Sequence, residues 1–299
     1  MVTVGYIGLG LMGKPMARHI LQAGYPLVVH NRSRKSVNEL AGEGAVAASS
    51  PAEVASKVDV LFTNLPDSPD VESVVLGPQG AIQGAHPGLI IVDNSTISPA
   101  SARHVASELQ KAGVPFLDAP VSGGEVGAIQ GTLTIMAGGS EETFSQVLPI
   151  LQTMGQKITY VGESGSGQIA KAANQIMVAA QMVALGEMLL FAQKAGADPR
   201  KVVEAARYGS AACWALDTKP ERLFSGNRQP GFKSRLQAKD LNIVLQTARE
   251  ASIPLPSTAI NAQLFNAMVA LGFGDLDNSA VLSVIEQLAG ERLHEDGSV

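Results

Sequence analysis

Short apolar runs alternate with amphipathic segments along the first half of the chain. Seven of these runs are predicted strands, because they are rich in Val, Ile, Leu and Phe and end in polar or turn-forming residues. They cover residues 2–7, 26–30, 58–64, 89–93, 114–118, 133–138 and 158–161. Strands that are apolar throughout are typical of a sheet covered on both faces. The pattern therefore predicts a mainly parallel sheet between helices.

The strand pattern stops near residue 163, and helical patterns follow. The run QIAKAANQIMVAAQMVALGEMLLFAQKAG begins at residue 168 and would span roughly 40 Å as one helix. Asp198 is a predicted N-cap with Pro199 in the first turn of the next helix, and RLQAKDLNIVLQTAREA and AVLSVIEQLAG continue the pattern. The second half of the chain is therefore predicted to be all-α.

These patterns divide the chain into three parts. We expect an α/β N-terminal domain over residues 1–163, a long interdomain helix over 164–195, and an all-α C-terminal domain over 196–299. The C-terminal domain is expected to serve self-association, because its apolar helices offer large faces. We expect a homodimer or a homotetramer.

Composition narrows the class of protein. Hydrophobic residues make up 45% of the 299 residues, and the formal net charge is −5, which argues against a nucleic-acid binder. Cys213 is the single cysteine, so no disulfide can form within the chain, and we expect a reducing, cytoplasmic location. The N-terminus runs directly into a strand pattern without a signal sequence.

The apolar run from residue 168 is the one segment long enough to suggest a membrane span. It contains Lys171, Gln181, Glu187 and Gln193, and each of these groups is costly inside a bilayer. We therefore expect a buried helix and no membrane partner.

A glycine-rich turn follows the first predicted strand. The segment YIGLGLMGKPMARHILQAG contains a G-x-G-x-x-G array between a strand and an amphipathic helix. In this context the glycines permit a tight turn, a close approach of a pyrophosphate and close helix–strand packing, and the helix start offers N–H groups. A turn without a ligand is the alternative, but the context favours a dinucleotide-binding Rossmann domain. The candidate cofactor-binding residues are Gly8, Leu9, Gly10, Leu11, Met12 and Gly13.

The end of the second predicted strand, VVHNRSRK, indicates which dinucleotide binds. Asn31 stands where NAD-binding folds carry an acid for the ribose 2′-OH. No carboxylate is present to repel a 2′-phosphate, Arg32 can pair with that group, and Asn31 and Ser33 can donate hydrogen bonds. A solvated basic helix start is the alternative. We predict that NADP(H) is preferred and that NAD(H) is possible.

Three other strand ends supply candidate site residues. NLPD (64–67) and DNSTISP (93–99) should lie at the carboxyl edge of the sheet, where ligands of this fold class bind. The turn after DAPV can hold a carboxylate with its N–H groups and hydroxyl, although an ordinary turn would look the same. The candidates are Leu65, Pro66, Ser95 and Thr96 for the cofactor, and Ser122, Gly123 and Gly124 for the substrate.

Polar groups also begin the long apolar helix. Lys171, Asn174 and Gln175 follow the spacing i, i+3, i+4 within its first turns. A lysine in such a helix can simply reach solvent. It can also donate a proton to a substrate that the neighbouring amides orient.

Together these stretches resemble the β-hydroxyacid dehydrogenase family. GYIGLGLMGKPMA, DAPVSGGEVGA, GSGQIAKAANQ and GFKSRLQAKDLNI occur in this order, and the resemblance covers essentially the whole chain. It implies an NAD(P)-dependent oxidoreductase that acts on CH–OH groups. Its small carboxylate substrate would be an aldehyde reduced to the hydroxyacid by hydride transfer, with Lys171 as general acid and base.

The resemblance also implies roles for the remaining residues. Asn174 and Gln175 would share the amide role next to the lysine, and their division of labour stays open. Lys239 would lie over the site near the nicotinamide with Asp240 beside it, and Phe232 would help to close the pocket, so the C-terminal domain would also bind the substrate. Thr96 would touch the cofactor. The substrate carboxylate would bind the turn at residues 122–124.

The members that the chain most resembles reduce tartronate semialdehyde to D-glycerate. Glu125 after SGG and the NRS segment favour them. 3-Hydroxyisobutyrate dehydrogenase is the alternative, and reduction of succinic semialdehyde or glyoxylate is another, because a pocket for one short acid often tolerates others.

A catalytically silent nucleotide-binding scaffold is an alternative of a different class. Such a protein would be expected to lose the lysine, whereas this chain keeps both Lys171 and Lys239. The five histidines have no metal-ligand spacing, so no metal site is predicted.

Overall fold

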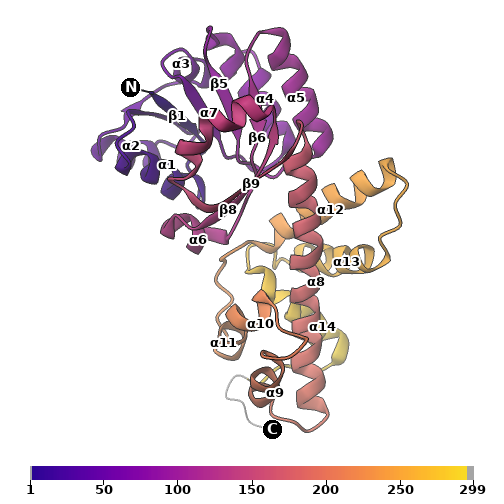
Figure 1. Cartoon of the computed structure of the whole chain (residues 1–299). Coiled ribbons are helices and arrows are strands. Elements are labelled where there is room, and N and C mark those ends of the chain that lie inside the picture. The colour runs from indigo at the N-terminus through magenta and orange to yellow at the C-terminus, as the bar shows by residue number, and fades with distance from the viewer. Residues whose placement is uncertain (1, 295–299) are drawn as a thin grey trace. The chain divides into compact units, whose positions relative to one another are not determined.

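The computed structural model describes residues 2–294 of the chain. It consists of two compact units whose boundary falls between Lys171 and Ala172. The boundary lies inside helix α8 (Ser166–Lys194), which is continuous through both units (Figure 1). Among the described residues, every strand belongs to the first unit, and the second unit is helical.

The first unit contains one nine-stranded sheet. The strand order is β3-β2-β1-β4-β5-β6-β8-β7, and β9 pairs with β8. The pairs from β3 to β6 are parallel, as is β8 with β9, whereas β8 is antiparallel to β6 and β7. This confirms the predicted mainly parallel sheet, and the apolar pattern missed only β3 and β7. The strands are β1 (Val4–Ile7), β2 (Leu27–His30), β3 (Val46–Ala47), β4 (Val60–Thr63), β5 (Ile90–Asp93), β6 (Phe116–Asp118), β7 (Val121–Ser122), β8 (Leu133–Gly139) and β9 (Gly155–Gly162).

Side chains alternate between two apolar cores, one on each face of the sheet. On β5, Ile90 and Val92 belong to one core and Ile91 belongs to the other. Because both faces are covered, both sets of side chains are apolar, and the strand appears in the sequence as a continuous run. Helices α1 (Gly13–Gln22), α2 (Arg34–Gly42), α6 (Gly124–Gln130) and α7 (Glu141–Leu151) cover the first face. Helices α3 (Pro51–Ala55), α4 (Ser68–Leu76) and α5 (Pro99–Lys111) cover the second, with the 3-10 turn η1 (Ala81–Gly84) (Figure 1).

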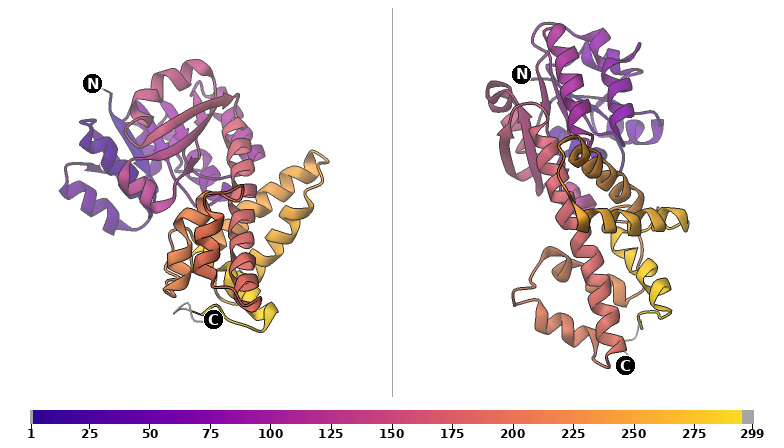
Figure 2. Two further views of the ribbon diagram at one scale, coloured as in Figure 1. Left: turned by 60° about the horizontal axis from the view of Figure 1, so that its bottom comes forward. Right: turned by 90° about the vertical axis from the view of Figure 1, so that its right-hand side faces the viewer.

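The second unit has one apolar core, formed by the later part of α8 and the helices that follow. Asp198 caps α9 by accepting the N–H of Arg200 at 2.8 Å, and Pro199 is its first residue, as the sequence predicts. Helices α12 and α13 pack against each other (Figure 2). The helices are α9 (Pro199–Ala206), α10 (Trp214–Thr218), α11 (Pro220–Phe224), α12 (Ser234–Glu250), α13 (Pro256–Ala270), the 3-10 turn η2 (Asn278–Val281) and α14 (Leu282–Ala289).

Helix α8 is the one helix of residues 2–294 that is long and apolar enough to cross a membrane, judged by length and composition. Half of its most apolar window is buried inside the protein. Ala179, Met182 and Leu189 on this helix belong to the core of the second unit. Packing within that unit therefore accounts for much of its apolar character.

Candidate active site

The loop between β1 and α1 brings the glycine array to the carboxyl edge of the sheet. Gly8 has a φ of +95°, and a Cβ there would lie 2.1 Å from the carbonyl oxygen of Asn64. A Cβ on Gly13, the first residue of α1, would lie 1.9 Å from the carbonyl oxygen of Gly8. A Cβ on Gly10 would meet nothing within 4 Å. Packing within the unit therefore requires Gly8 and Gly13, whereas the backbone at Gly10 stays open to an approaching pyrophosphate.

The start of α1 also suits a phosphate. Met12 occupies the N-cap position, and no side chain caps the helix. The first N–H groups of a helix lack intrahelical partners, and with the positive end of the helix dipole they attract anions. Leu9 is buried, whereas Leu11 is exposed next to the open Gly10. The residues present therefore fit a dinucleotide.

Asn31 follows β2 and fixes the shape of this edge. Its Oδ1 accepts the N–H of Leu9 at 3.0 Å, and its Nδ2 donates to the Oγ of Ser33 at 2.9 Å and to its carbonyl oxygen at 3.1 Å. Arg32 and Ser33 are exposed. The amide of Asn31 thus joins the glycine loop to residue 33. Of the three candidates at residues 31–33, Arg32 and Ser33 are the ones exposed to solvent.

Ser95 connects the loops that follow β4 and β5. Its hydroxyl donates to Oδ1 of Asp93 at 2.5 Å and accepts the N–H of Leu65 at 2.8 Å. Ser95 is 2% exposed, Leu65 and Thr96 are half-buried, and Pro66 is exposed. The buried hydroxyl therefore orders the two loops, while Leu65, Pro66 and Thr96 keep exposed surface at this edge.

The turn at residues 122–124 lies between β7 and α6. Gly123 and Gly124 have φ values of +132° and +62°, which let the chain pass from the strand into the helix within two residues. Ser122 is half-buried, and Gly123 is exposed. The turn therefore presents a hydroxyl and successive N–H groups on accessible backbone, which is the arrangement expected to hold a carboxylate.

Sequence reasoning missed two buried residues that hold the start of α8. The carboxylate of Asp118 accepts the N–H of Gly165 at 2.7 Å and the N–H of Gln168 at 2.9 Å. The side chain of Gln168 donates to the carbonyl oxygen of Ser95 at 2.8 Å and accepts the N–H of Ile97 at 3.1 Å. The first turn of α8 is therefore bound to the carboxyl ends of β5 and β6.

Burial raises the pKa of Asp118 to about 7, and nearby Asp93 acts in the same direction. The two backbone N–H groups act in the opposite direction, because they stabilise the carboxylate. A group whose folded-state pKa is raised favours the folded state most below its unfolded value near 3.8. That contribution is lost as the pH rises through 7.

Lys171 lies on α8 one turn after Gln168 and is 6% exposed. The two amides that follow are linked, since Nδ2 of Asn174 donates to Oε1 of Gln175 at 2.9 Å. Nε2 of Gln175 donates to Oδ2 of Asp240 on α12 at 2.6 Å, and both residues are buried. The side chain of Gln175 therefore joins α8 to α12, and Asn174 is the half-buried member of the pair.

Lys239 and Phe232 come from the second unit. Nζ of Lys239 forms an ion pair with Oδ1 of Asp240 at 3.1 Å, so this lysine is linked through Asp240 to Gln175. Phe232 is half-buried, and its N–H donates to Oδ2 of Asp277 at 3.2 Å. The structure thus connects Lys239 to α8 and ties the Phe232 segment to a buried carboxylate.

Asp277 is a third residue that sequence reasoning missed. It is fully buried, pairs with Lys219 at 2.8 Å, and accepts the N–H of Gly231 at 2.8 Å and the hydroxyl of Ser279 at 2.6 Å. Burial would raise the pKa of Asp277, but Lys219 and these hydrogen bonds outweigh it and lower the pKa to about 2. The carboxylate is therefore charged at neutral pH and supports the segment before α12.

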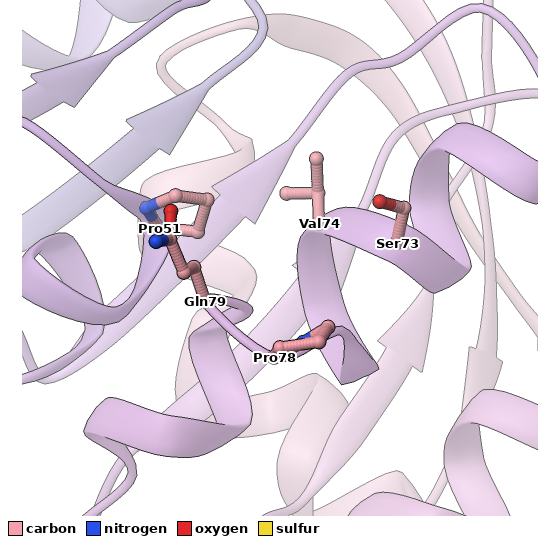
Figure 3. Close-up of a pocket in the computed structure, with 5 residues that line it drawn as sticks. All are labelled: Pro51, Ser73, Val74, Pro78 and Gln79. Carbon is pink, nitrogen blue, oxygen red and sulfur yellow. The ribbon is translucent and has the colours of Figure 1, made fainter.

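The pocket in Figure 3 is lined by none of the predicted site residues. The pocket has a volume of about 400 Å³ and contains no ionisable side chain. It is lined by Pro51, Ser73, Val74, Pro78 and Gln79. Residues 2–294 contain no group of three or more His, Cys, Asp or Glu side chains that could hold a metal ion.

Comparisons with known proteins cover nearly the whole chain. Residues 3–162 match the family model for the NAD binding domain of 6-phosphogluconate dehydrogenase. Residues 165–285 match the model described as NAD-binding of NADP-dependent 3-hydroxyisobutyrate dehydrogenase. The boundary between the two matches lies just before α8.

Two curated proteins and one solved structure illustrate the similarity. The 2-hydroxy-3-oxopropionate reductase of Escherichia coli (strain K12) is 43% identical over 292 residues, which are 98% of this chain and 100% of that protein. The 2-(hydroxymethyl)glutarate dehydrogenase of Eubacterium barkeri is 38% identical over 290 residues, 97% of this chain and 96% of that protein. The crystal structure of 3-hydroxyisobutyrate dehydrogenase from Salmonella typhimurium has a TM-score of 0.86 at 30% identity, and the match covers 95% of this chain and 100% of that one.

Proposed function

We propose that this chain, which belongs to the β-hydroxyacid dehydrogenase family, reduces a small carboxylated aldehyde to the hydroxyacid with NADPH. The family consists of NAD(P)-dependent oxidoreductases that act on CH–OH groups. One observation supports the proposal most directly. The buried Lys171 lies in a helix whose first turn is hydrogen-bonded to the carboxyl edge of the sheet.

Bound NADPH would supply a hydride to the aldehyde carbon. Negative charge then grows on the carbonyl oxygen, and the ammonium of Lys171 stabilises this charge and donates a proton. In the reverse direction, the neutral amine accepts the proton of the alcohol. Asn174 or Gln175 is proposed to orient the amine or the substrate; the half-buried Asn174 donates to Gln175, and the buried Gln175 donates to Asp240.

The substrate carboxylate is proposed to bind the turn formed by Ser122, Gly123 and Gly124. The half-buried hydroxyl and the accessible N–H groups of this turn support that assignment. Lys239 is proposed to bind the same carboxylate, and within its own unit it forms an ion pair with Asp240. Phe232 is proposed to close the pocket as an apolar wall.

Tartronate semialdehyde is the substrate that we propose, with D-glycerate as its product. The 43% identity to 2-hydroxy-3-oxopropionate reductase over the full length of that protein supports this choice. 3-Hydroxyisobutyrate dehydrogenase activity is the second candidate, because the family model for the C-terminal part and the solved structure carry that name.

A panel of C2 to C4 aldehyde acids, assayed by NADPH oxidation, tests the proposal. We expect the highest kcat/KM for tartronate semialdehyde and lower values for methylmalonate semialdehyde, succinic semialdehyde and glyoxylate. One missing or added methylene in a pocket changes kcat/KM by about 10- to 200-fold. A higher kcat/KM for methylmalonate semialdehyde would favour the second candidate, and inactivity with the whole panel would exclude both.

NADPH is proposed as the preferred cofactor, and Arg32 is its main determinant. In Arg32→Ala, kcat/KM with NADPH should fall by about 10- to 100-fold, because a hydrogen bond between charged groups contributes about 1.5–3 kcal/mol. NADH lacks the 2′-phosphate and is the internal control, so its kcat/KM should change little. An equal loss with both cofactors would contradict the assignment.

Asn31→Asp tests the same cofactor preference by repulsion. An aspartate can still accept the N–H of Leu9, but it cannot donate to Ser33. Its charge should disfavour the 2′-phosphate and shift the preference toward NADH. Arg32→Ala thus removes an attraction for the 2′-phosphate, whereas Asn31→Asp adds a repulsion.

We also propose that the protein acts in the cytoplasm as a homodimer or homotetramer. Several large apolar side chains of the second unit are exposed, among them Phe191 (75%), Ile260 (65%) and Leu288 (75%). Contact between copies of the chain would cover such side chains.

A further inference from the structure

Gln168 has no part in the proposed chemistry, although its buried side chain forms two hydrogen bonds. We propose that Gln168 is a positioning residue that sets the place of Lys171 relative to the loop after β5. This inference rests on the proposed role of Lys171 as the proton donor. Because only 1% of its surface is exposed, Gln168 is proposed to act through Lys171 and not by binding a ligand itself.

Both hydrogen bonds of the Gln168 side chain reach the same short backbone segment. Nε2 donates to the carbonyl oxygen of Ser95 at 2.8 Å, and Oε1 accepts the N–H of Ile97 at 3.1 Å. Thr96, a proposed cofactor contact, lies between these two backbone groups. A single 1% exposed side chain therefore binds both ends of a segment that is proposed to contact the cofactor.

The backbone of Gln168 is held as firmly as its side chain. Its N–H donates to Asp118 at 2.9 Å, and the N–H of Gly165 donates to the same carboxylate at 2.7 Å. A Cβ on Gly167 would lie 2.4 Å from the carbonyl oxygen of Met136 and 2.6 Å from that of Asp118. The first turn of α8 thus packs directly on the backbone of β8 and β6, so it has little freedom to slide.

Helical geometry passes this restraint on to Lys171. Residues i and i+3 are neighbours on one side of a helix, and Gln168 and Lys171 have this spacing. Catalytic groups are sensitive to position, and a displacement of about 1 Å can cost about 100-fold in rate. Without the Gln168 amide, two buried backbone groups would lose their partner, and the loop and helix could separate.

Gln193, near the other end of α8, provides a matched control. Its Nε2 donates to the carbonyl oxygen of Arg292 at 2.9 Å, and its Oε1 accepts the N–H of His294 at 2.8 Å. It is 7% exposed. Gln193 therefore makes the same two kinds of bond on the same helix, to a segment with no proposed catalytic role.

Gln168→Met and Gln193→Met separate positioning from general stabilisation. Methionine keeps the length of the side chain and removes both hydrogen bonds. Gln168→Met should lower kcat for the aldehyde by about 10- to 100-fold with KM for the aldehyde nearly unchanged, because proton donation and not carboxylate binding is disturbed. Gln193→Met should keep the wild-type kcat. A wild-type kcat in Gln168→Met, or an equal loss in Gln193→Met, would overturn the inference.

Gln168→Glu is the conservative variant, and it covers the case in which Gln168→Met does not fold. A carboxylate at this position can accept the N–H of Ile97 but cannot donate to the carbonyl oxygen of Ser95. Its kcat should therefore fall between those of the wild type and Gln168→Met. A wild-type kcat in a folded Gln168→Glu protein would also count against positioning.

Hydrogen exchange gives a readout that does not depend on activity. Gln168→Met should speed amide exchange in residues 95–97 and 165–171, and Gln193→Met should do so only in residues 291–294. Unchanged exchange at residues 95–97 would reject the inference, even if the wild type reduced none of the aldehydes. An active wild type with unaffected Gln168 variants would reject the inference and leave the proposed function standing.

Discussion

In Lys171→Ala, kcat for aldehyde reduction should fall by about 10³-fold, while NADPH binds as tightly as in the wild type. General acid–base catalysis contributes about 10²- to 10⁴-fold, and the ammonium of Lys171 is proposed both to stabilise the growing negative charge and to donate the proton. The glycine loop and the Arg32 segment, which are proposed to hold the cofactor, lie on other elements. Loss of the amine should therefore change kcat far more than the Kd for NADPH.

Lys194→Ala is the matched control on the same helix. The side chain of Lys194 is 49% exposed, and its Nζ donates to the carbonyl oxygen of Ala289 at 3.1 Å. Removing this amine takes a lysine from α8 without touching the proposed site, so kcat should stay at the wild-type value.

Steady-state NADPH oxidation at saturating aldehyde measures kcat for both variants, and quenching of protein fluorescence by NADPH measures its Kd. A kcat in Lys171→Ala within tenfold of the wild type would remove Lys171 from the proton-donor role. An equal weakening of NADPH binding would mean that the substitution disturbed the cofactor site instead.

The fold could be predicted largely because the central strands β1, β4 and β5 are buried and apolar on both faces. Ile90, Ile91 and Val92 serve two different cores, and the continuous run in the sequence records this burial. Strands β3 and β7 are two residues long and carry no comparable pattern. A short strand is defined by its hydrogen-bonded neighbours, so a local pattern cannot indicate it.

The candidate site likewise contains residues that the sequence predicts and residues that it does not. The glycines at residues 8, 10 and 13 could be predicted because their spacing between a strand and a helix is a local feature of the sequence. Asp118 and Gln168 could not, because their partners lie 47 to 73 residues away along the chain. An amide at the start of an apolar helix is the one sequence signal that could have indicated Gln168. It does not identify the residues to which the amide is hydrogen-bonded.

Asp277 is a similar case in the second unit. Lys219, its ion-pair partner, is 58 residues away, and no motif joins the two. Phe232 was a candidate only through the family resemblance, and the structure adds that its N–H is held by Asp277. The residues that support a site were thus harder to predict than the residues that form it.

Asp277→Ala should lower the free energy of unfolding by about 3–5 kcal/mol, because it leaves the ammonium of Lys219 buried without its carboxylate. The side chains of Lys219 and Asp277 are 7% and 0% exposed, so water cannot replace the lost partner. The Gly231 and Phe232 N–H groups lose their acceptor as well. Urea unfolding, followed by circular dichroism, measures the change.

Asp275→Ala is the control two residues away. Asp275 forms ion pairs with Lys233, at 2.8 Å, and with Arg235, but its side chain is 61% exposed. Exposed pairs contribute about 0–1 kcal/mol, so this variant should be nearly as stable as the wild type. Equal destabilisation of the two variants would show that burial does not explain the contribution of the Asp277–Lys219 pair to the free energy of unfolding.

The pH dependence of unfolding tests the same pair without removing volume. The pKa of Asp277 is about 2 in the folded protein, against an ordinary value of 3.8 in an unfolded chain. A lowered pKa stabilises the folded state above pH 3.8, by about 2–3 kcal/mol, and this contribution is lost as the pH falls toward 2. Asp277→Asn cannot titrate, so between pH 4 and pH 2 its stability should fall less steeply than that of the wild type. Parallel curves for the two proteins would mean that Asp277 keeps an ordinary pKa, and the ion pair with Lys219 would then contribute little to folding.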